Sequence, residues 1–515
     1  MIRRFAIPLA FTAALLALTT VPRVQATPIL TWSFWGAGAV LLIWQISLAF
    51  LQKPVSSKRE REGGFRIVRV PPRKQHYVQA VCHATIYAYW GWYWPPVYDF
   101  MPLLLAQLLF AYAFDILLAW SRGEDYQIGF GPFPIVFSTN LFLWFKDDWF
   151  YWQFVLIALG FAGKAFVGWN REGKRVHIFN PSAFTLAIFS IVLLATGTTN
   201  LTWGQEIAST FSLGPHIYKL LFVVGLVVMY FFAITTVTAA AAATLVGLSA
   251  LYVSVTGVPY FVDSYIPSAV FLGLHLLVTD PSTSPRTPLG RLIFGVGYGV
   301  GVFALYSLLG LMGMPTFYDK LLCVPLLNLA VRAIDRNVKA IGRSDLLHRL
   351  ALDGPLGRGN LAHMMVWTAF FFLMMNTGSA DGMHRGDALP FWEQACADNK
   401  PRACERLLRI EANYCGDNAG WACNELGRHH LEGKIVPPDP ERAIAYFSRA
   451  CEGRFQAGCV NLLDSSMISR ANPRPLDLRL LLREGGPNLL EMPEPELYQR
   501  ACRHGWSFAC QRAAN

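Results

Sequence analysis

The chain of 515 residues is 54% hydrophobic, 14% aromatic and only 15% charged, with a formal net charge of +10. This composition, together with apolar runs of bilayer-spanning length, predicts an integral membrane protein and excludes an ordinary soluble domain. The basic residues lie in short loops between apolar segments, where they orient helices, and no basic repeat or stacking platform is present. We therefore expect the lipid bilayer, and no nucleic acid, as a partner.

Residues 1–52 predict two N-terminal transmembrane helices. Arg3 and Arg4 precede an apolar run that ends at Val21, so the first helix is either a signal anchor or a signal peptide. The sequence Val24-Gln25-Ala26 would serve as a cleavage site; we favour the uncleaved helix. The segment ends on the extracytoplasmic side of the membrane in both cases, and after the second helix residues 53–76 form a basic cytoplasmic loop.

Apolar stretches near the length of a bilayer core recur along the chain and predict about thirteen spans. Basic residues concentrate in alternate loops, including a linker at 334–359, which places those loops in the cytoplasm and the carboxyl terminus outside. We expect a multi-pass protein of a bacterial inner membrane with a periplasmic tail. The expected spans are 5–21, 30–51, 77–93, 97–120, 129–146, 150–168, 181–199, 216–234, 237–256, 264–279, 290–311, 317–333 and 360–377.

Polar segments interrupt the ten expected spans between 77 and 333. A basic loop runs into Asn180-Pro181, where Asn180 suits a helix N-cap and Pro181 the first helical position. A second polar segment contains Thr279-Asp280-Pro281. Irregular backbone at membrane depth persists only when it is packed in protein or lines a cavity. A third polar run, Ser138-Thr139-Asn140, lies inside an apolar stretch. These segments are candidate functional sites, above all the two that contain Asn180 and Thr279.

These two segments resemble a known family. Phe179-Asn180-Pro181-Ser-Ala resembles the F-N-P-A signature of the RnfD/NqrB family, whose members belong to the Rnf electron-transport complex and to the sodium-translocating NADH:quinone oxidoreductase. Thr279-Asp280-Pro281 with Gly290-Arg291-Leu-Ile-Phe-Gly resembles the T-D-P and G-R-L-I-F-G segment of the same family. The resemblance implies an all-α core at 77–333, built as two five-helix units in an inverted repeat, with electron transfer through flavin coupled to ion movement.

The resemblance implies FMN or riboflavin as the cofactor. Family members with covalent FMN attach it to a threonine of an external loop, with the signature S/T-x-A-T. The corresponding loop here is shorter, and Ala208-Ser209-Thr210 lies at about the right place without matching the signature. We therefore expect noncovalent rather than covalent flavin. The candidate cofactor-binding residues are Thr210, Asn180, Pro181, Thr279, Asp280 and Pro281.

Ionisable residues within the expected spans are candidates for an ion or proton relay. Asp115 is costly at membrane depth unless it is paired or hydrated. His275 is a second candidate, although a hydrogen-bonded core histidine is the more common role for it and for His83. Cys82 and Cys323 are isolated in spans and cannot ligate an iron–sulfur cluster, so we assign no metal.

The tail at 385–515 contains eight of the ten cysteines, in four pairs with seven residues between the members of each pair. Zinc sites favour shorter C-x₂₋₄-C spacings, so we favour disulfides, which persist outside the cytoplasm. The helix-turn-helix pattern predicts an α-solenoid, and the tail resembles cysteine-rich Sel-one-like members of the tetratricopeptide superfamily. That resemblance implies one disulfide per repeat: Cys396–Cys404, Cys415–Cys423, Cys451–Cys459 and Cys502–Cys510.

Three functions follow as hypotheses. The first is a membrane-embedded redox subunit that holds flavin, associates with other electron-transport subunits and docks a periplasmic protein or peptide on its repeats. The second is a membrane scaffold without catalysis, which recruits periplasmic proteins through the repeats. The third is a transporter of an ion or small solute. If the chain is an enzyme, it is a redox component of a membrane electron-transport complex; no catalytic residue is assigned.

Overall fold

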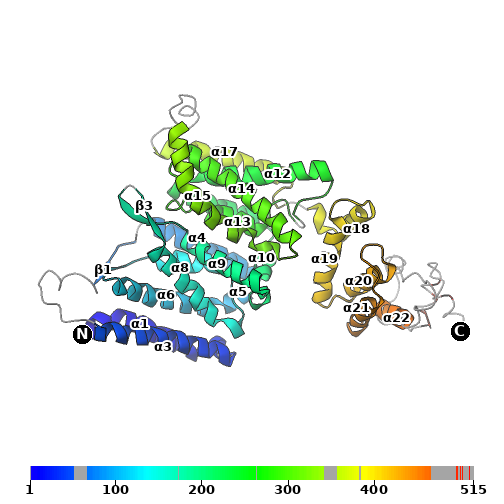
Figure 1. The fold of residues 1–515 in the computed structure, drawn as a ribbon, viewed down its shortest axis with the longest axis horizontal. Helices are drawn as coiled ribbons and strands as arrows, with labels where there is room; N and C mark the ends of the chain where they lie inside the picture. The colour runs from blue at the N-terminus through cyan, green and yellow to red at the C-terminus, as the bar shows by residue number, and fades with distance from the viewer. Residues whose placement is uncertain are drawn as a thin grey trace, which may run out of the picture. The chain divides into compact units, whose positions relative to one another are not determined.

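The computed structural model describes residues 2–51, 66–72, 74–171, 173–261, 264–341, 356–381 and 384–465, together with 495, 496, 499, 502 and 510. The described chain is mostly helical and divides into two compact units (Figure 1). The first unit comprises Met1–Leu251 and Ser264–His384, and we call it the membrane unit because it contains helices long and apolar enough to cross a membrane. The repeat unit comprises Tyr252–Asp263 and Arg385–Asn515. The predicted all-α fold class is thus confirmed, apart from two short two-stranded sheets.

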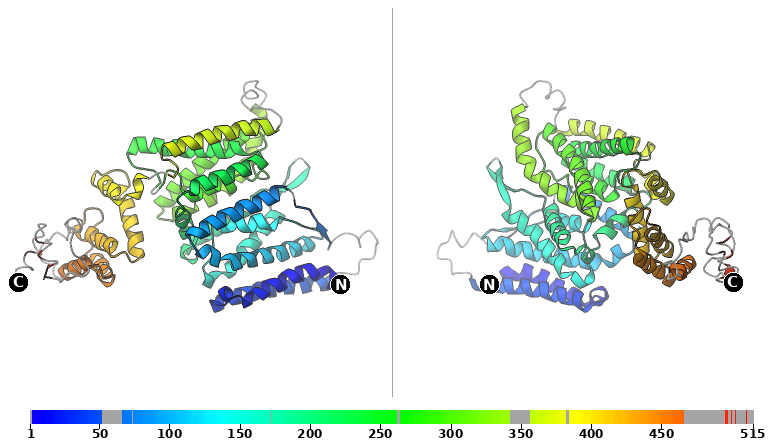
Figure 2. Two further views of the ribbon diagram at one scale, coloured as in Figure 1. Left: turned by 180° about the vertical axis from the view of Figure 1, so that it is seen from behind. Right: turned by 45° about the vertical axis from the view of Figure 1, so that its right-hand side comes forward.

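The membrane unit begins with a helical hairpin. Helix α1 packs against α3 and α6, and α3 also contacts α8. The hairpin forms one edge of the unit, with α12, α14 and α17 toward the opposite edge (Figures 1 and 2). The helices of the membrane unit are α1 (Ile2–Ala17), α2 (Pro22–Gln25), α3 (Pro28–Leu51), α4 (Lys74–Tyr93), α5 (Pro96–Asp99), α6 (Met101–Ser121), α7 (Pro132–Asn140), α8 (Tyr151–Phe166), α9 (Pro181–Thr196), α10 (Gly204–Phe211), α11 (Ile217–Phe232), α12 (Thr235–Thr256, whose last residues belong to the repeat unit), α13 (Ser268–Leu276), α14 (Pro288–Leu311), α15 (Asp319–Ile341) and α17 (Leu356–Asn376).

The count of thirteen spans is not supported. Among the described residues, four helices are long and apolar enough to cross a membrane: Pro28–Phe50, Pro96–Ser121, Thr235–Thr256 and Pro288–Leu311. Four apolar helices are shorter: Phe5–Thr20, Tyr151–Phe166, Pro181–Thr196 and Ile217–Phe232. The stretches expected to span at 129–146 and 264–279 contain only nine-residue helices, α7 and α13. An apolar run therefore overestimates a span where a helix ends early and irregular backbone continues the run.

Close approach of backbones holds the second half of the membrane unit together. Helix α14 packs on α12 through Gly295, where a Cβ atom would collide with the carbonyl oxygen of Val237 and lie 2.9 Å from the Cβ of Ala240. Gly299 likewise faces Thr244, one turn further along both helices. Small residues at helix contacts are typical of membrane proteins, because packing rather than water exclusion drives helix association in lipid.

Two small sheets lie in loops of the membrane unit. Strand β1 (Ile67–Arg69) pairs in parallel with β2 (Tyr126–Ile128), and Ile67 faces Tyr126. Strand β3 (Gly168–Arg171) pairs antiparallel with β4 (Lys174–His177), and Gly168 faces His177. The β3–β4 hairpin is the basic loop that leads into Asn180, so it places that residue at the start of α9.

The repeat unit is a series of short helices, each packed against the next: α18 (Leu389–Ala397), α19 (Ala403–Gly416), α20 (Gly420–Glu432), α21 (Pro440–Glu452) and α22 (Gln456–Ser465). The disulfides Cys396–Cys404, Cys415–Cys423, Cys451–Cys459 and Cys502–Cys510 are all present. The first three join consecutive helices. The predicted helical repeats with disulfides are thus confirmed.

The segment Tyr252–Phe261 folds with the repeats, although the sequence pattern assigned it to the ten-helix core. Val258 is fully buried in a cluster with Trp392 and Leu407. Arg406, which is buried and lies over the Trp392 ring, donates hydrogen bonds to the carbonyl oxygens of Pro259 and Tyr260. A bidentate guanidinium contact with backbone carbonyls thus holds a loop that the sequence alone does not associate with the tail.

Candidate functional site: a polar cavity in the membrane unit

The two polar segments singled out in the sequence meet at one cavity of about 260 Å³ in the membrane unit. Helices α4, α7, α8, α9 and α11 contribute to its wall, together with the loop that follows α13. Its polar and motif residues are Gln79, Cys82, His83, Ser138, Lys164, His177, Asn180, Pro181, Ser182, Thr279, Asp280, Pro281 and Ser282. Five of the six residues predicted to bind a cofactor therefore line a single space.

Asn180 has the predicted role of N-cap. Its side-chain oxygen accepts hydrogen bonds from the backbone amides of Ser182 and Ala183 at 3.0 and 3.2 Å, and Pro181 occupies the first helical position. The side-chain nitrogen of Asn180, Nδ2, also donates a hydrogen bond to the carbonyl oxygen of Leu277 at 3.3 Å. This contact joins the start of α9 to the loop after α13, which is how the two segments come together.

Asn328 of α15 strengthens this junction. Its side-chain oxygen accepts a hydrogen bond from the backbone amide of Asn180 at 3.1 Å, and its side-chain nitrogen donates to the carbonyl oxygen of Thr283 at 3.1 Å. One buried amide thus bonds both polar segments, which satisfies backbone groups that have no helical partner. The sequence pattern did not single out Asn328, because a lone asparagine within a helix has no local signature.

Asp280 stabilises its own loop. Its carboxylate accepts hydrogen bonds from the amide and hydroxyl of Ser282 at 2.9 and 2.6 Å, and lies 4.0 Å from Nε2 of His177. Although burial opposes ionisation, the interactions with His177 and Ser282 hold the pKa of Asp280 below its ordinary value. The cavity thus contains a carboxylate beside an imidazole nitrogen.

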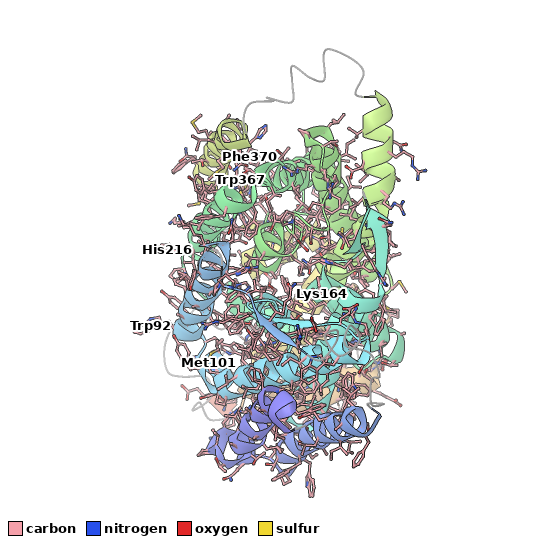
Figure 3. The ribbon with its side chains drawn as sticks, turned by 90° about the vertical axis from the view of Figure 1, so that its left-hand side faces the viewer. Trp92, Met101, Lys164, His216, Trp367 and Phe370 are labelled. Carbon is pink, nitrogen blue, oxygen red and sulfur yellow. A yellow bond between two sulfur atoms is a disulfide. The ribbon has the colours of Figure 1, made fainter. Side chains whose placement is uncertain are left out.

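Lys164 supplies a positive charge to the wall of the cavity. Gly131 is the N-cap of α7, without a side-chain cap, and a Cβ at this glycine would lie 3.9 Å from Nζ of Lys164. Lys164 lies at the middle of the unit in Figure 3, whereas Trp92 and His216 lie toward its margin. Pro132 and Pro134 carry no amide hydrogen and the Phe133 amide bonds the Phe130 carbonyl oxygen, so α7 offers few free amides here. The Lys164 ammonium is therefore the group that attracts an anion. The cavity can therefore hold a small polar molecule with negative charge at this end.

His83 contributes to the cavity as well as to packing. Its Nδ1 lies 2.8 Å from the carbonyl oxygen of Gln79, and its Nε2 lies 3.0 Å from Oγ of Ser138 on α7. The imidazole therefore joins α4 to α7 while it lines the cavity wall. A histidine with both nitrogens hydrogen-bonded is suited to hold its ring orientation.

The other predicted site residues lie elsewhere. Thr210 is on α10, where its hydroxyl accepts a hydrogen bond from Trp90 at 3.2 Å and donates to the Ile207 carbonyl at 3.3 Å. Asp115 lies beside Tyr126 and does not line the cavity. Nδ1 of His275 donates a hydrogen bond to the Phe271 carbonyl oxygen at 2.7 Å, and its ring fills the space left by Gly225 on α11. The cofactor role of Thr210 and the relay roles of Asp115 and His275 stay predictions.

Asn140, one of the polar residues noted inside an apolar stretch, belongs to a network of three fully buried amides, whose other two members the sequence pattern did not single out. Asn140 donates to Oε1 of Gln107 at 2.7 Å, and Gln153 donates to Oδ1 of Asn140 at 3.1 Å. The network ties α6, α7 and α8 together without a charge. Polar residues in apolar stretches were the available signal, but they do not indicate which partners meet.

Comparisons with known proteins concern only the tail. Residues 422–454 match the Sel1 repeat, over α20 and α21 with the Cys415–Cys423 and Cys451–Cys459 disulfides at the two ends. No curated protein and no solved structure matches the chain. The part of the chain from 422 to 454 is therefore similar to a Sel1 repeat, as the cysteine spacing predicts.

Proposed function

We propose that the chain is a membrane-embedded electron-transport subunit whose extracytoplasmic repeats dock a protein or peptide. The observation that supports this proposal is the convergence of Asn180-Pro181 and Thr279-Asp280-Pro281 on one polar cavity. These are the segments through which the sequence resembles the RnfD/NqrB family. Nine-residue helices on both sides of the cavity, α7 and α13, suit an inverted repeat with interrupted helices around a site.

The cavity fits only part of a flavin. Ligand pockets for molecules of this size usually have volumes of about 300–1,000 Å³, and the cavity has about 260 Å³. Lys164 suits the phosphate of FMN, so the cavity can hold that end of the molecule, and the three-ring system would then lie outside it. We therefore assign no electron-transfer step to these residues.

The extracytoplasmic location of the tail is part of the proposal. It now rests on the four disulfides, which persist outside the reducing cytoplasm, and not on the number of spans. In a Gram-negative bacterium this compartment would be the periplasm. A reporter enzyme fused after Asn515 and active only in the cytoplasm would overturn this assignment.

Optical absorbance of the purified protein tests the redox proposal. We expect a flavin spectrum, either as isolated or after addition of FMN or riboflavin, and a weaker spectrum in Lys164→Gln. Thr210→Ala is the matched control for noncovalent binding, because Thr210 lies outside the cavity. A protein that shows no flavin under any of these conditions would exclude the redox function.

The size of the cavity favours a second candidate, transport of a small anion or ion. Its polar residues Lys164, His177 and Asp280 come from three different segments, as in transporters whose substrate site lies between interrupted helices. Uptake into proteoliposomes by the protein, with loss of uptake in Lys164→Gln and no flavin spectrum, would favour transport over electron transfer. If the protein shows no flavin spectrum and no uptake, the scaffold role remains, which the match to a Sel1 repeat supports.

A further inference from the structure

A buried group of three potential metal ligands lies in the repeat unit. Glu411 is on α19, and Glu425 and His429 are on α20, one turn apart. One ligand atom from each lies within 4.8 Å of the others, and all three residues are buried. Residues four apart on a helix project from the same face, so α20 directs two of these side chains toward α19.

Two of the ligand atoms already have the spacing of a metal site. Nε2 of His429 lies 3.1 Å from Oε2 and 3.3 Å from Oε1 of Glu411. Ligand atoms at about 2.0–2.1 Å from a tetrahedral zinc ion are about 3.3 Å apart. The single proton that Nε2 can carry serves one of the two oxygens, and within the described part of the chain Oε2 of Glu411, a residue 1% exposed, accepts no hydrogen bond.

The charges around the group favour an added cation. Arg428 binds Glu425 and Glu432 at 2.7 and 3.0 Å, and the exposed Lys434 binds Glu432 at 3.3 Å. These two cations balance Glu425 and Glu432, whereas no lysine or arginine among the described residues forms an ion pair with Glu411. A buried carboxylate without a compensating charge is strongly unfavourable.

The group lies on two helices that are cross-linked and closely packed. The Cys415–Cys423 disulfide joins α19 to α20 between Glu411 and Glu425 in the chain. A hydrogen-bonded Arg428 holds Glu425 through one oxygen, Oε2, which leaves Oε1 for a ligand. Gly427 lets the Phe447 ring pack directly on α20. Fixed ligands in a pre-organised site lose little freedom when the ion binds.

We propose that Glu411, Glu425 and His429 bind a divalent transition-metal ion, of which zinc is the best match, with water as the fourth ligand. Imidazole and carboxylate ligands in a four-coordinate site suit Zn²⁺. The ion joins α19 to α20 in addition to the disulfide. Coordination through Nε2 takes the imidazole in its neutral form, which keeps its one proton on Nδ1.

The test uses full-length protein in detergent, without an affinity tag and after treatment with a chelator. Zinc content after dialysis against ZnCl₂ is measured by elemental analysis, and affinity by competition with a chromophoric chelator. We expect one zinc ion per chain that is lost, or bound at least about tenfold more weakly, in Glu411→Gln and in His429→Gln.

His430→Gln is the matched control, because His430 is the adjacent residue and stacks on Tyr446 at 5.5 Å. It should bind zinc as the unmodified protein does. The number of free thiols in each variant shows whether the Cys415–Cys423 disulfide remains intact. If a variant has lost this disulfide, Glu425→Gln is tested in its place. An unmodified protein that takes up no zinc, or equal zinc in Glu411→Gln and His430→Gln, would overturn the proposal.

Discussion

Different interactions stabilise the interior of each of the two units of this protein. In the membrane unit, buried polar side chains are mostly neutral, such as the Gln107, Asn140 and Gln153 amides, and helices approach closely at glycine. In the repeat unit, disulfides and the contact between Glu411 and His429 join short helices. Neutral hydrogen bonds and small residues suit an apolar surrounding, whereas cross-links stabilise helices too short to form alone.

The largest change in stability is expected when a disulfide of the repeat unit is removed. Opening Cys415–Cys423 in the double variant Cys415→Ala/Cys423→Ala should cost the repeat unit about 2–3 kcal/mol of unfolding free energy, because the unfolded chain regains the freedom of the closed loop. The measurement is denaturant unfolding of the full-length protein, with limited proteolysis to report on each unit. Cys82→Ala, which leaves every disulfide intact, is the control. Equal loss in both units would contradict the comparison.

Close packing of α12 on α14 gives the next effect. Gly295→Ala should destabilise the membrane unit by about 1–3 kcal/mol, because the new Cβ collides with the backbone of Val237. Gly247→Ala on α12 is the matched control, since nothing lies within 4 Å of its Cβ position. That change should be neutral or slightly stabilising, as alanine favours a helix over glycine. Thermal unfolding in detergent measures both, and similar values would refute close packing.

The buried amide network predicts a dependence on matched partners. Asn140→Leu should cost about 1–2 kcal/mol, because Gln107 and Gln153 lose hydrogen bonds in a buried site. Replacing all three amides by leucine should cost less than the sum of the three single changes, since no unsatisfied partner remains. Strictly additive losses in thermal unfolding would show that the amides act independently.

The smallest effect is expected on the surface of the repeat unit. Arg409 lies 3.4 Å from Glu405 one helical turn away, and both side chains are well exposed. Arg409→Gln should change stability by less than about 0.5 kcal/mol, and the change should vanish at high salt. A loss that persists in high salt would mean that Arg409 contributes through packing rather than charge.

Much of the repeat unit could be predicted from the sequence because its determinants are local. The cysteines of each disulfide are eight positions apart, and a bond between consecutive helices requires only that a short turn close. The N-cap at Asn180 is equally local, since the side chain bonds amides two and three residues further on. In contrast, Glu411 and His429 meet only because α19 and α20 pack side by side, and the spacing of Glu425 and His429 was the sole signal available.

The sequence by itself therefore determined the apolar helices, the helical repeats, the disulfide pairs and the two polar segments. Only the tertiary structure decided that Asn180 and Leu277, 97 residues apart, share a hydrogen bond, and that α7 and α13 end after nine residues. It also decided that Tyr252–Phe261 folds with the repeats. Composition and short-range bonding act within a few residues, whereas helix ends and cavities depend on which distant side chains fill the space beside them.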